Sequence, residues 1–261
     1  MKKLLLLVLV IGVVLFGACA TTPGPATTPG PKITPGPGEI NAGPGEINAG
    51  PGEINVGPGE SDLKKINGSG NIKTSEFDIK NFNKVEVSGE GILIIEQGDV
   101  EGLVVKTDDN LLEHVKVSVS ENKLKIENIV DEGYDLVPSD SIYYYLKLKD
   151  LEELELPGIV TVECDNLQIN SLNLDMSGIT EVRLTGYVDI LNISLDGIGT
   201  LKGRDFLSTE CSITGTGNAD ILLSVSETLD IVFTGIGSIK YIGDPEVKEG
   251  AGKFVDIERI D

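Results

Sequence analysis

The reactive side chains of this chain are few, and their number limits the reactions that it can catalyse. The 261 residues contain one His and three Cys, so any Ser-His or Cys-His pair would depend on His114. This leaves little material for a zinc site, and we expect no metal and no cofactor. Cys164 and Cys211 lie about two and a half sequence repeats apart in apolar segments. That separation is too great for a disulfide, so we expect two buried free thiols.

Carboxylates are abundant and suggest two further kinds of site. The run Asp108-Asp109-Asn110 offers oxygen ligands for Ca²⁺, although three short polar residues more often form a turn, which we favour. Glu163, Glu181 and Arg183 fall at outward positions of neighbouring repeats. A polysaccharide-cleaving enzyme would need such a set, but solvated surface charge is the simpler interpretation.

Three consecutive tyrosines, Tyr143, Tyr144 and Tyr145, lie in a segment that is typical of a strand. Successive strand residues point to opposite faces, so the three rings cannot all be buried. An exposed Tyr is a suitable anchor for a sugar or a protein. We therefore predict that this strand and the hairpin before it form a binding face.

The N-terminus has the features of an export signal. Lys2 and Lys3 precede an apolar run from Leu4 to Phe16, which is too short for a comfortable membrane span. The sequence Phe16-Gly17-Ala18-Cys19 resembles the bacterial lipobox, although Leu is usual where Phe16 stands. We predict a signal peptide over residues 1–18 and a lipid on Cys19, while an ordinary secretory signal remains the alternative.

Residues 19–60 are rich in Thr, Pro and Gly and contain a seven-residue repeat, Gly-Pro-Gly-Glu-Ile-Asn-Ala. Pro and Gly disfavour helix and strand, which predicts a disordered tether. A collagen-like stalk is excluded because the repeat period is seven and not three.

Residues 61–261 contain a second, longer repeat. Gly158, Gly178, Gly197, Gly215 and Gly235 recur every 18 to 20 residues, with alternating apolar residues before and after each. Alternation is typical of half-buried strands, and repetition without helical segments is typical of a solenoid. The pattern predicts an all-β, single-stranded parallel β-helix with coils of about 18–21 residues. A β-sandwich or an up-and-down barrel would not explain the constant period.

Two earlier glycines, Gly68 and Gly89, carry similar apolar neighbours and extend the predicted ladder. The interval from Gly89 to Gly158 does not fit a whole number of coils, which predicts an irregular insertion. Within it, residues 115–119 and 124–126 alternate around a polar turn and predict a hairpin.

Isoleucine recurs directly after the repeated glycines, at Ile159, Ile179, Ile198 and Ile236. Strict alternation would place these side chains outside as an apolar stripe suitable for contact with a partner. A corner at the glycine would instead turn them into the core, and we favour that interpretation.

The residues also resemble a known family. Segments 85–89 and 108–112, the Ser-Gly-Ile and Gly-Ile-Gly repeats, and Tyr241-Ile242-Gly243-Asp244-Pro245 are similar to the putative auto-transporter adhesin, head GIN domain family. The resemblance covers roughly residues 77–252 and implies a right-handed β-helix with a non-enzymatic, adhesin-like surface role. It supplies no catalytic residues.

Together these observations predict a lipid-anchored protein of the bacterial cell envelope, in the outer leaflet of the cytoplasmic membrane or in the outer membrane. Its expected partners are the membrane, through the anchor, and an envelope polysaccharide or another surface protein. The net charge of −21 argues against nucleic acid, because phosphate binding needs clustered Lys and Arg. A carbohydrate-active enzyme that uses outward carboxylates is the alternative function.

Overall fold

The structure, a computed structural model, describes residues 63–261, so the predicted signal peptide, the tether and Cys19 lie outside the described residues. The described chain forms seventeen strands and one short 3-10 helix: β1 (Lys64–Asn67), β2 (Ile72–Phe77), β3 (Lys84–Val87), β4 (Glu90–Gln97), β5 (Gly102–Asp108), η1 (Leu112–His114), β6 (Val115–Ser120), β7 (Lys123–Asn128), β8 (Tyr134–Val137), β9 (Tyr143–Leu148), β10 (Glu153–Glu155), β11 (Ile159–Asp175), β12 (Ile179–Leu195), β13 (Ile198–Gly215), β14 (Asn218–Phe233), β15 (Ile236–Ile242), β16 (Glu246–Glu249) and β17 (Val255–Arg259). Over these residues no helix has the length and apolar character to span a bilayer.

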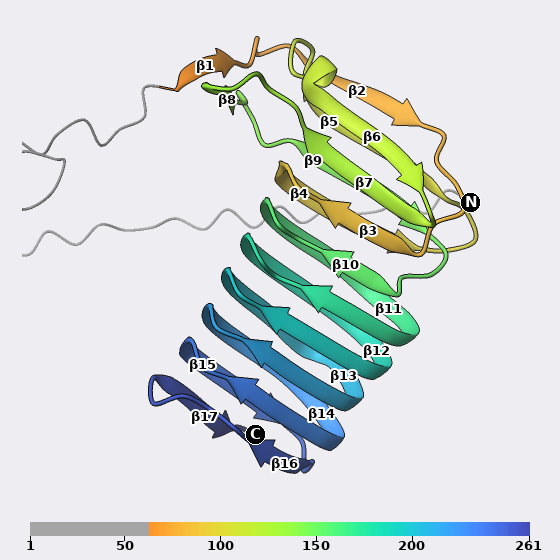
Figure 1. Cartoon of the computed structure of the whole chain (residues 1–261). Coiled ribbons are helices and arrows are strands. Elements are labelled where there is room, and N and C mark those ends of the chain that lie inside the picture. Colours follow the sequence, from red (N-terminus) through yellow and green to blue (C-terminus); the bar gives the residue numbers. More distant parts are fainter. Residues whose placement is uncertain (1–62) are drawn as a thin grey trace, which may run out of the picture. The chain divides into compact units, whose positions relative to one another are not determined.

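Strands β11 to β14 are successive coils of a parallel β-solenoid, which confirms the predicted fold class (Figure 1). Each coil pairs in parallel with the next, so that equivalent residues stack. Val162 pairs with Val182, for example, and Val182 pairs with Leu201. The alternating apolar residues of the sequence repeat therefore become continuous ladders inside the coils.

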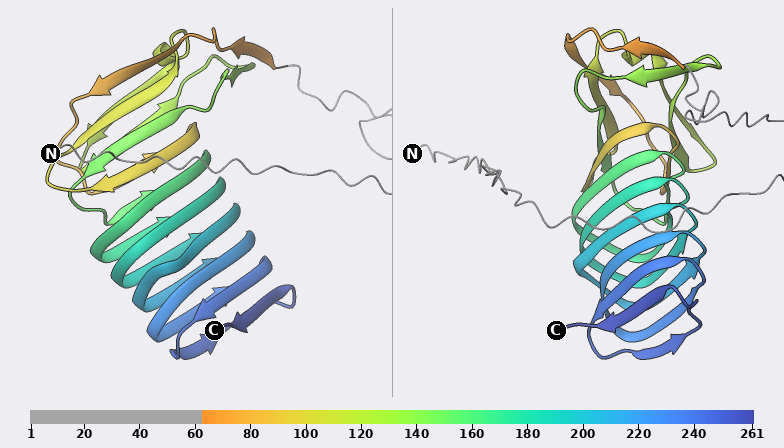
Figure 2. Two further views of the ribbon diagram at one scale, coloured as in Figure 1. Left: turned by 180° about the vertical axis from the view of Figure 1, so that it is seen from behind. Right: turned by 90° about the vertical axis from the view of Figure 1, so that its left-hand side faces the viewer.

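Each coil bends where the inward alternation is interrupted. In β11 the buried positions change phase between Cys164 and Leu167 and again between Ile169 and Leu172. The bends divide the solenoid into two main sides (Figure 2). Side A contains β2, β5, β9, β4, the first parts of β11 to β14, β15 and β17; side B contains β6, β7, β3, β10, the last parts of β11 to β14, and β16.

The core between these sides is mainly aliphatic. One ladder runs through five coils with the side chains of Leu154, Leu174, Ile193, Ile213 and Ile231, all buried. Burial of one such side chain contributes about 1.5–3 kcal/mol relative to exposure. The repeated ladders make the solenoid a rigid support for its outer surface.

Glycine forms the corner that leads from side B to side A. A Cβ on Gly178 would overlap the carbonyl oxygen of Gly158, and a Cβ on Gly197 would overlap that of Gly178. The corner therefore requires glycine because adjacent coils approach closely there, as the repeat suggested.

One position of the predicted alignment was wrong. The corner glycine of the fourth coil is Gly217, not Gly215, because Gly217 is the residue that stacks on Gly197. Gly215 instead lies in the ladder between Leu195 and Phe233, with a φ of 144°. Both glycines have the same alternation phase, so the sequence pattern alone did not distinguish them.

The irregular insertion predicted before Gly158 forms the N-terminal end of the solenoid. Here β6 and β7 make the predicted hairpin, and β2, β5 and β9 pair in antiparallel fashion. Gly89 joins β3 to β4 as a true coil corner, but Gly68 does not. It follows β1, which pairs with β8 in a separate two-stranded sheet, so the parallel winding begins at β3.

Candidate binding surface

The tyrosine strand β9 lies on side A between β4 and β5. Tyr144 points inward and is fully buried; its hydroxyl donates to the Glu90 carbonyl and accepts from Asn128 Nδ2. Burial raises the pKa of Tyr144 to about 12. This ring is part of the hydrophobic core and is not accessible to a ligand. We therefore exclude Tyr144 from the predicted binding residues.

Tyr143 and Tyr145 point outward and stack on each other. Their ring centroids are 6.1 Å apart, the rings are 12° from parallel, and Tyr145 is 37% exposed. Lys106 Nζ lies 5.0 Å from the centre of the Tyr143 ring, a cation–π distance. A rigid strand thus presents two aligned aromatic faces.

The register surrounds the two rings with apolar neighbours. Ile92 and Ile94 of β4 pair with Tyr143 and Tyr145, and Val104 of β5 pairs with Tyr145. All three aliphatic side chains are half-buried. We call these five residues, Tyr143, Tyr145, Ile92, Ile94 and Val104, the tyrosine patch.

The isoleucines that follow the corner glycines lie outside, which contradicts the interpretation that we favoured from the sequence. Ile159, Ile179, Ile198 and Ile236 are 52–59% exposed. The alternation continues without interruption from the corner, since the buried residue is the next one, as at Val160. Asn218 takes the equivalent place in the fourth coil, not Thr216 as the alignment on Gly215 implied.

Two shallow pockets lie against this row of isoleucines. One, of about 360 Å³, is lined by residues that include Glu90, Ile92, Ser141, Ile159 and Thr161. The other, of about 320 Å³, is lined by residues that include Ile159, Thr161, Ile179, Glu181, Ile198 and Thr200. Ile159 and Thr161 belong to both, so we describe the two pockets together as the corner groove.

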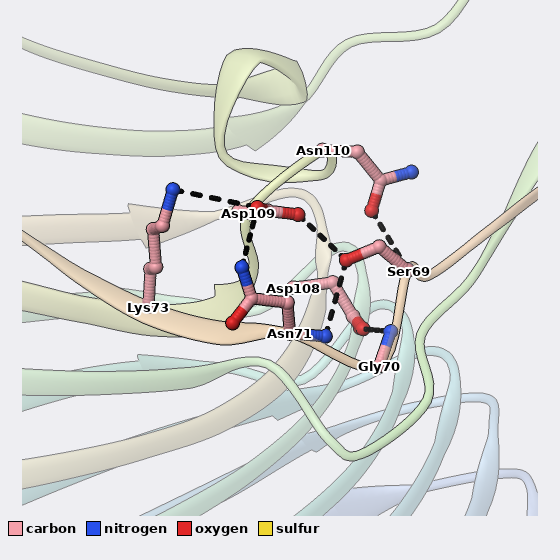
Figure 3. Close-up of polar contacts among 7 residues, drawn as sticks. All are labelled: Ser69, Gly70, Asn71, Lys73, Asp108, Asp109 and Asn110. Carbon is pink, nitrogen blue, oxygen red and sulfur yellow. Dashed lines mark hydrogen bonds and ion pairs between the residues drawn. The ribbon is translucent and has the colours of Figure 1, made fainter.

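The run Asp108-Asp109-Asn110 forms a clamp that ties the β5–η1 turn to the segment between β1 and β2 (Figure 3). Asp108 is buried and accepts hydrogen bonds from the Gly70 N–H, 2.7 Å, and from the Ser139 N–H and hydroxyl, 2.9 and 2.6 Å. Burial acts to raise the pKa of Asp108, but the bonds from Ser139 and Gly70 outweigh it and lower the pKa.

Asp109 and Asn110 complete the clamp. Asp109 accepts from the Ser69 hydroxyl and Asn71 Nδ2 and lies 3.4 Å from Lys73 Nζ. The hydrogen bonds from Ser69 and Asn71 lower the pKa of Asp109 to about 2. Protein donors thus occupy these carboxylates, as expected for a structural turn.

The outward carboxylates that an enzyme would need are paired with cations. Arg183 lies 2.9 Å from Asp165 and 3.6 Å from Glu163, and Lys202 pairs with Glu181. These pairs join neighbouring coils across side A. Their arrangement is that of a charged outer surface.

A pocket of about 790 Å³ lies near the N-terminal end of the solenoid and was not foreseen from the sequence. It is lined by Ile66, Phe77, Glu113, His114, Val115, Lys116, Val117, Ile129, Val130, Asp131 and Tyr134. His114 Nδ1 lies 2.9 Å from the Ile129 carbonyl oxygen, and the lining includes no Ser or Cys that could serve as its nucleophile. Residues 115–119 alternate in the sequence and predict a strand, but the alternation did not indicate that Val115 and Val117 would line a pocket.

Cys164 and Cys211 are free and buried, as predicted. Burial raises the pKa of each thiol to about 12. Neither group is suited to act as a nucleophile or a metal ligand at neutral pH.

The chain is similar to a known protein family and to several solved structures. A family model described as "Putative auto-transporter adhesin, head GIN domain" matches residues 81–245. A crystal structure of a putative adhesin from Bacteroides fragilis is 21% identical, with a TM-score of 0.62 over 75% of this chain and 100% of that one. A putative lipid binding protein from Parabacteroides distasonis is 22% identical, with a TM-score of 0.48 over 76% of this chain and 100% of that one. A search of curated proteins gives no match.

Proposed function

The chain belongs to the putative auto-transporter adhesin, head GIN domain family, and from this premise we propose that it is a non-enzymatic, adhesin-like binding module of the bacterial cell envelope. Its partner is an envelope polysaccharide or a surface protein. The observation that carries the proposal is the stacked pair Tyr143 and Tyr145 on the outside of a rigid sheet. Aromatic rings held in this way offer a large contact area at low cost in conformational entropy.

The binding role can be tested with isolated cell envelopes. The Cys19→Ser chain, which lacks the lipid proposed below, is expected to sediment with envelopes, and the double change Tyr143→Ala/Tyr145→Ala in that chain is expected to lower its affinity at least about tenfold. Phe254→Ala is the matched control, because Phe254 is an exposed aromatic, 73%, outside the tyrosine patch. Treatment of the envelopes with periodate or with protease separates a polysaccharide partner from a protein partner. Equal sedimentation of the Cys19→Ser chain with and without the two tyrosine changes would contradict the proposal.

We also propose that Cys19 carries the lipid that anchors the chain. The sequence Phe16-Gly17-Ala18-Cys19 supports this, and multiple acyl chains would hold the protein stably on a bilayer. In cells fed an alkyne-bearing fatty acid, the wild-type chain is expected to take up the label and to fractionate with membranes. Cys19→Ser is expected to do neither, whereas Cys164→Ser, a change to a buried thiol, should leave both unchanged. Labelling of Cys19→Ser would disprove the assignment.

The ion pairs on side A support binding without cleavage. Glu163 lies beside Arg183, and Glu181 pairs with Lys202, so each of these carboxylates is held by a cation of a neighbouring strand. A polysaccharide that binds is therefore expected to remain intact, with no new reducing ends on prolonged incubation. The appearance of shortened products, lost in Glu163→Gln or Glu181→Gln, would favour the carbohydrate-active enzyme instead.

A further inference from the structure

We propose that the tyrosine patch and the corner groove form one continuous site for a linear polysaccharide, neutral or amino-bearing, whose chain lies along the solenoid axis. This inference rests on the proposed binding role of the tyrosine patch and specifies the ligand class, its direction and the additional residues that bind it.

The two surfaces are continuous because they share residues. Ile92 pairs with Tyr143 in the patch and also lines the first pocket of the corner groove. Ile159 and Thr161 then connect that pocket with the second one, which reaches Ile198 on β13. A ligand that contacts Tyr143 can therefore continue along the axis over β4, β11, β12 and β13.

The surface repeats along this direction. Ile159, Ile179 and Ile198 are stacked in register, about 4.8 Å from one strand to the next. Beside them runs a polar row of Thr161, Glu181 and Thr200, also in register. A polysaccharide has the matching properties, because its sugars repeat and each has an apolar C–H face and a hydroxyl edge.

The geometry favours a polysaccharide over an extended peptide. Peptides commonly add to a sheet through the hydrogen bonds of an unpaired edge strand. In the corner groove β11 and β12 are paired on both sides, β11 with β4 and β12 and β12 with β11 and β13. A ligand here must bind to side chains on the face of the sheet.

Charge selects the type of sugar. The chain has a net charge of −21, which disfavours an anionic polymer. Glu181 is paired with Lys202, but Glu90 in the first pocket has no ion-pair partner among residues 63–261. Partial burial, with a contribution from Asp135, raises the pKa of Glu90, so an amino group at this pocket would stabilise a carboxylate that is partly removed from water and unpaired.

The test measures binding of three series of oligosaccharides of increasing length: cello-oligosaccharides, which are neutral, chitosan oligosaccharides, which bear amines, and oligogalacturonates, which are anionic. We expect affinity to rise with chain length until the groove is filled, and the anionic series to bind most weakly. The variant Ile179→Arg/Ile198→Arg is expected to lose at least about tenfold for long chains and to change little for the shortest. Glu90→Gln is expected to remove any advantage of the amino series over the neutral one.

The matched control is Ile190→Arg/Val232→Arg, which introduces the same charges at exposed apolar positions, 43% and 55%, outside the corner groove. It is expected to bind like the wild type. Affinity that does not depend on length, preference for the anionic series, or no binding of any series would overturn the inference. If envelope binding still required Tyr143 and Tyr145 in those cases, the proposed function would stand without it. Full envelope binding by the tyrosine variant would remove the proposed function itself.

Discussion

At the scale of single residues, the corner glycines are determined by contact between coils. Gly197 has no room for a Cβ because the Gly178 carbonyl oxygen occupies that space. We predict that Gly197→Ala lowers the free energy of unfolding by about 1–3 kcal/mol, as overpacking in a close contact does. Urea unfolding followed by circular dichroism would measure this.

Gly98→Ala is the control for that substitution, since nothing lies within 4 Å of a Cβ placed on Gly98. It is expected to change stability by less than about 0.5 kcal/mol. Equal effects at the two sites would mean that glycine matters through the unfolded chain and not through the close approach of coils.

The hydrogen bonds and the ion pair of Asp109 predict that the free energy of unfolding depends on pH in the acidic range. The pKa of Asp109 is about 2 in the folded protein, against about 3.9 for an unfolded Asp, so its stabilising effect is complete above pH 4. The effect is lost as the pH falls from 4 to 2. In Asp109→Asn, urea midpoints should therefore fall less steeply over this range than in the wild type. Asp99→Asn, which removes an Asp without hydrogen-bond or ion-pair partners in the described chain, should follow the wild-type slope.

The two buried thiols predict slow chemical modification. With pKa values near 12, Cys164 and Cys211 should resist iodoacetamide in the native protein at pH 8 and react once denaturant unfolds it. Mass spectrometry of the peptides that contain each Cys would follow both sites separately. Rapid native labelling of Cys211 would show that its coil opens locally.

At the scale of elements, the sequence predicted the coils well because alternation and period are local properties. It located the β6–β7 hairpin and the strand of Tyr143 for the same reason. It could not assign Gly215 and Gly217 correctly, since residues two apart share one phase. Nor could it place Gly68, whose apolar neighbours resemble a coil although β1 pairs with β8.

The candidate site was predictable only in part. Alternation implied that the tyrosines of β9 could not all be buried, but it did not say which one lies inside. The row that contains Ile179 depended on whether the phase changes at the glycine corner, which the sequence does not record. The pocket beside His114 is formed by elements that lie far apart in the chain, so the sequence pattern did not indicate it.

At the scale of the whole molecule, the excess of acidic residues should be visible in the effect of salt. The chain has a net charge of −21, so its excess acidic side chains repel one another in the folded protein. Added salt screens this repulsion. Ion pairs such as that of Arg183 with Glu163 are exposed, so they contribute little to stability in comparison with the overall repulsion among the acidic groups. We expect the melting temperature to rise by about 2–4 °C from low to physiological salt if screening restores about 1 kcal/mol. A fall in melting temperature would mean that local pairs dominate.

The coils of the central solenoid touch only their neighbours, and this has a consequence for how such a protein can change. Copying the segment from one corner glycine to the next would add a rung without disturbing the strands at either end. Each added coil would extend the outward-facing row of isoleucines by one residue, at the same spacing between strands. The length of the solenoid can therefore change in fixed increments of one coil.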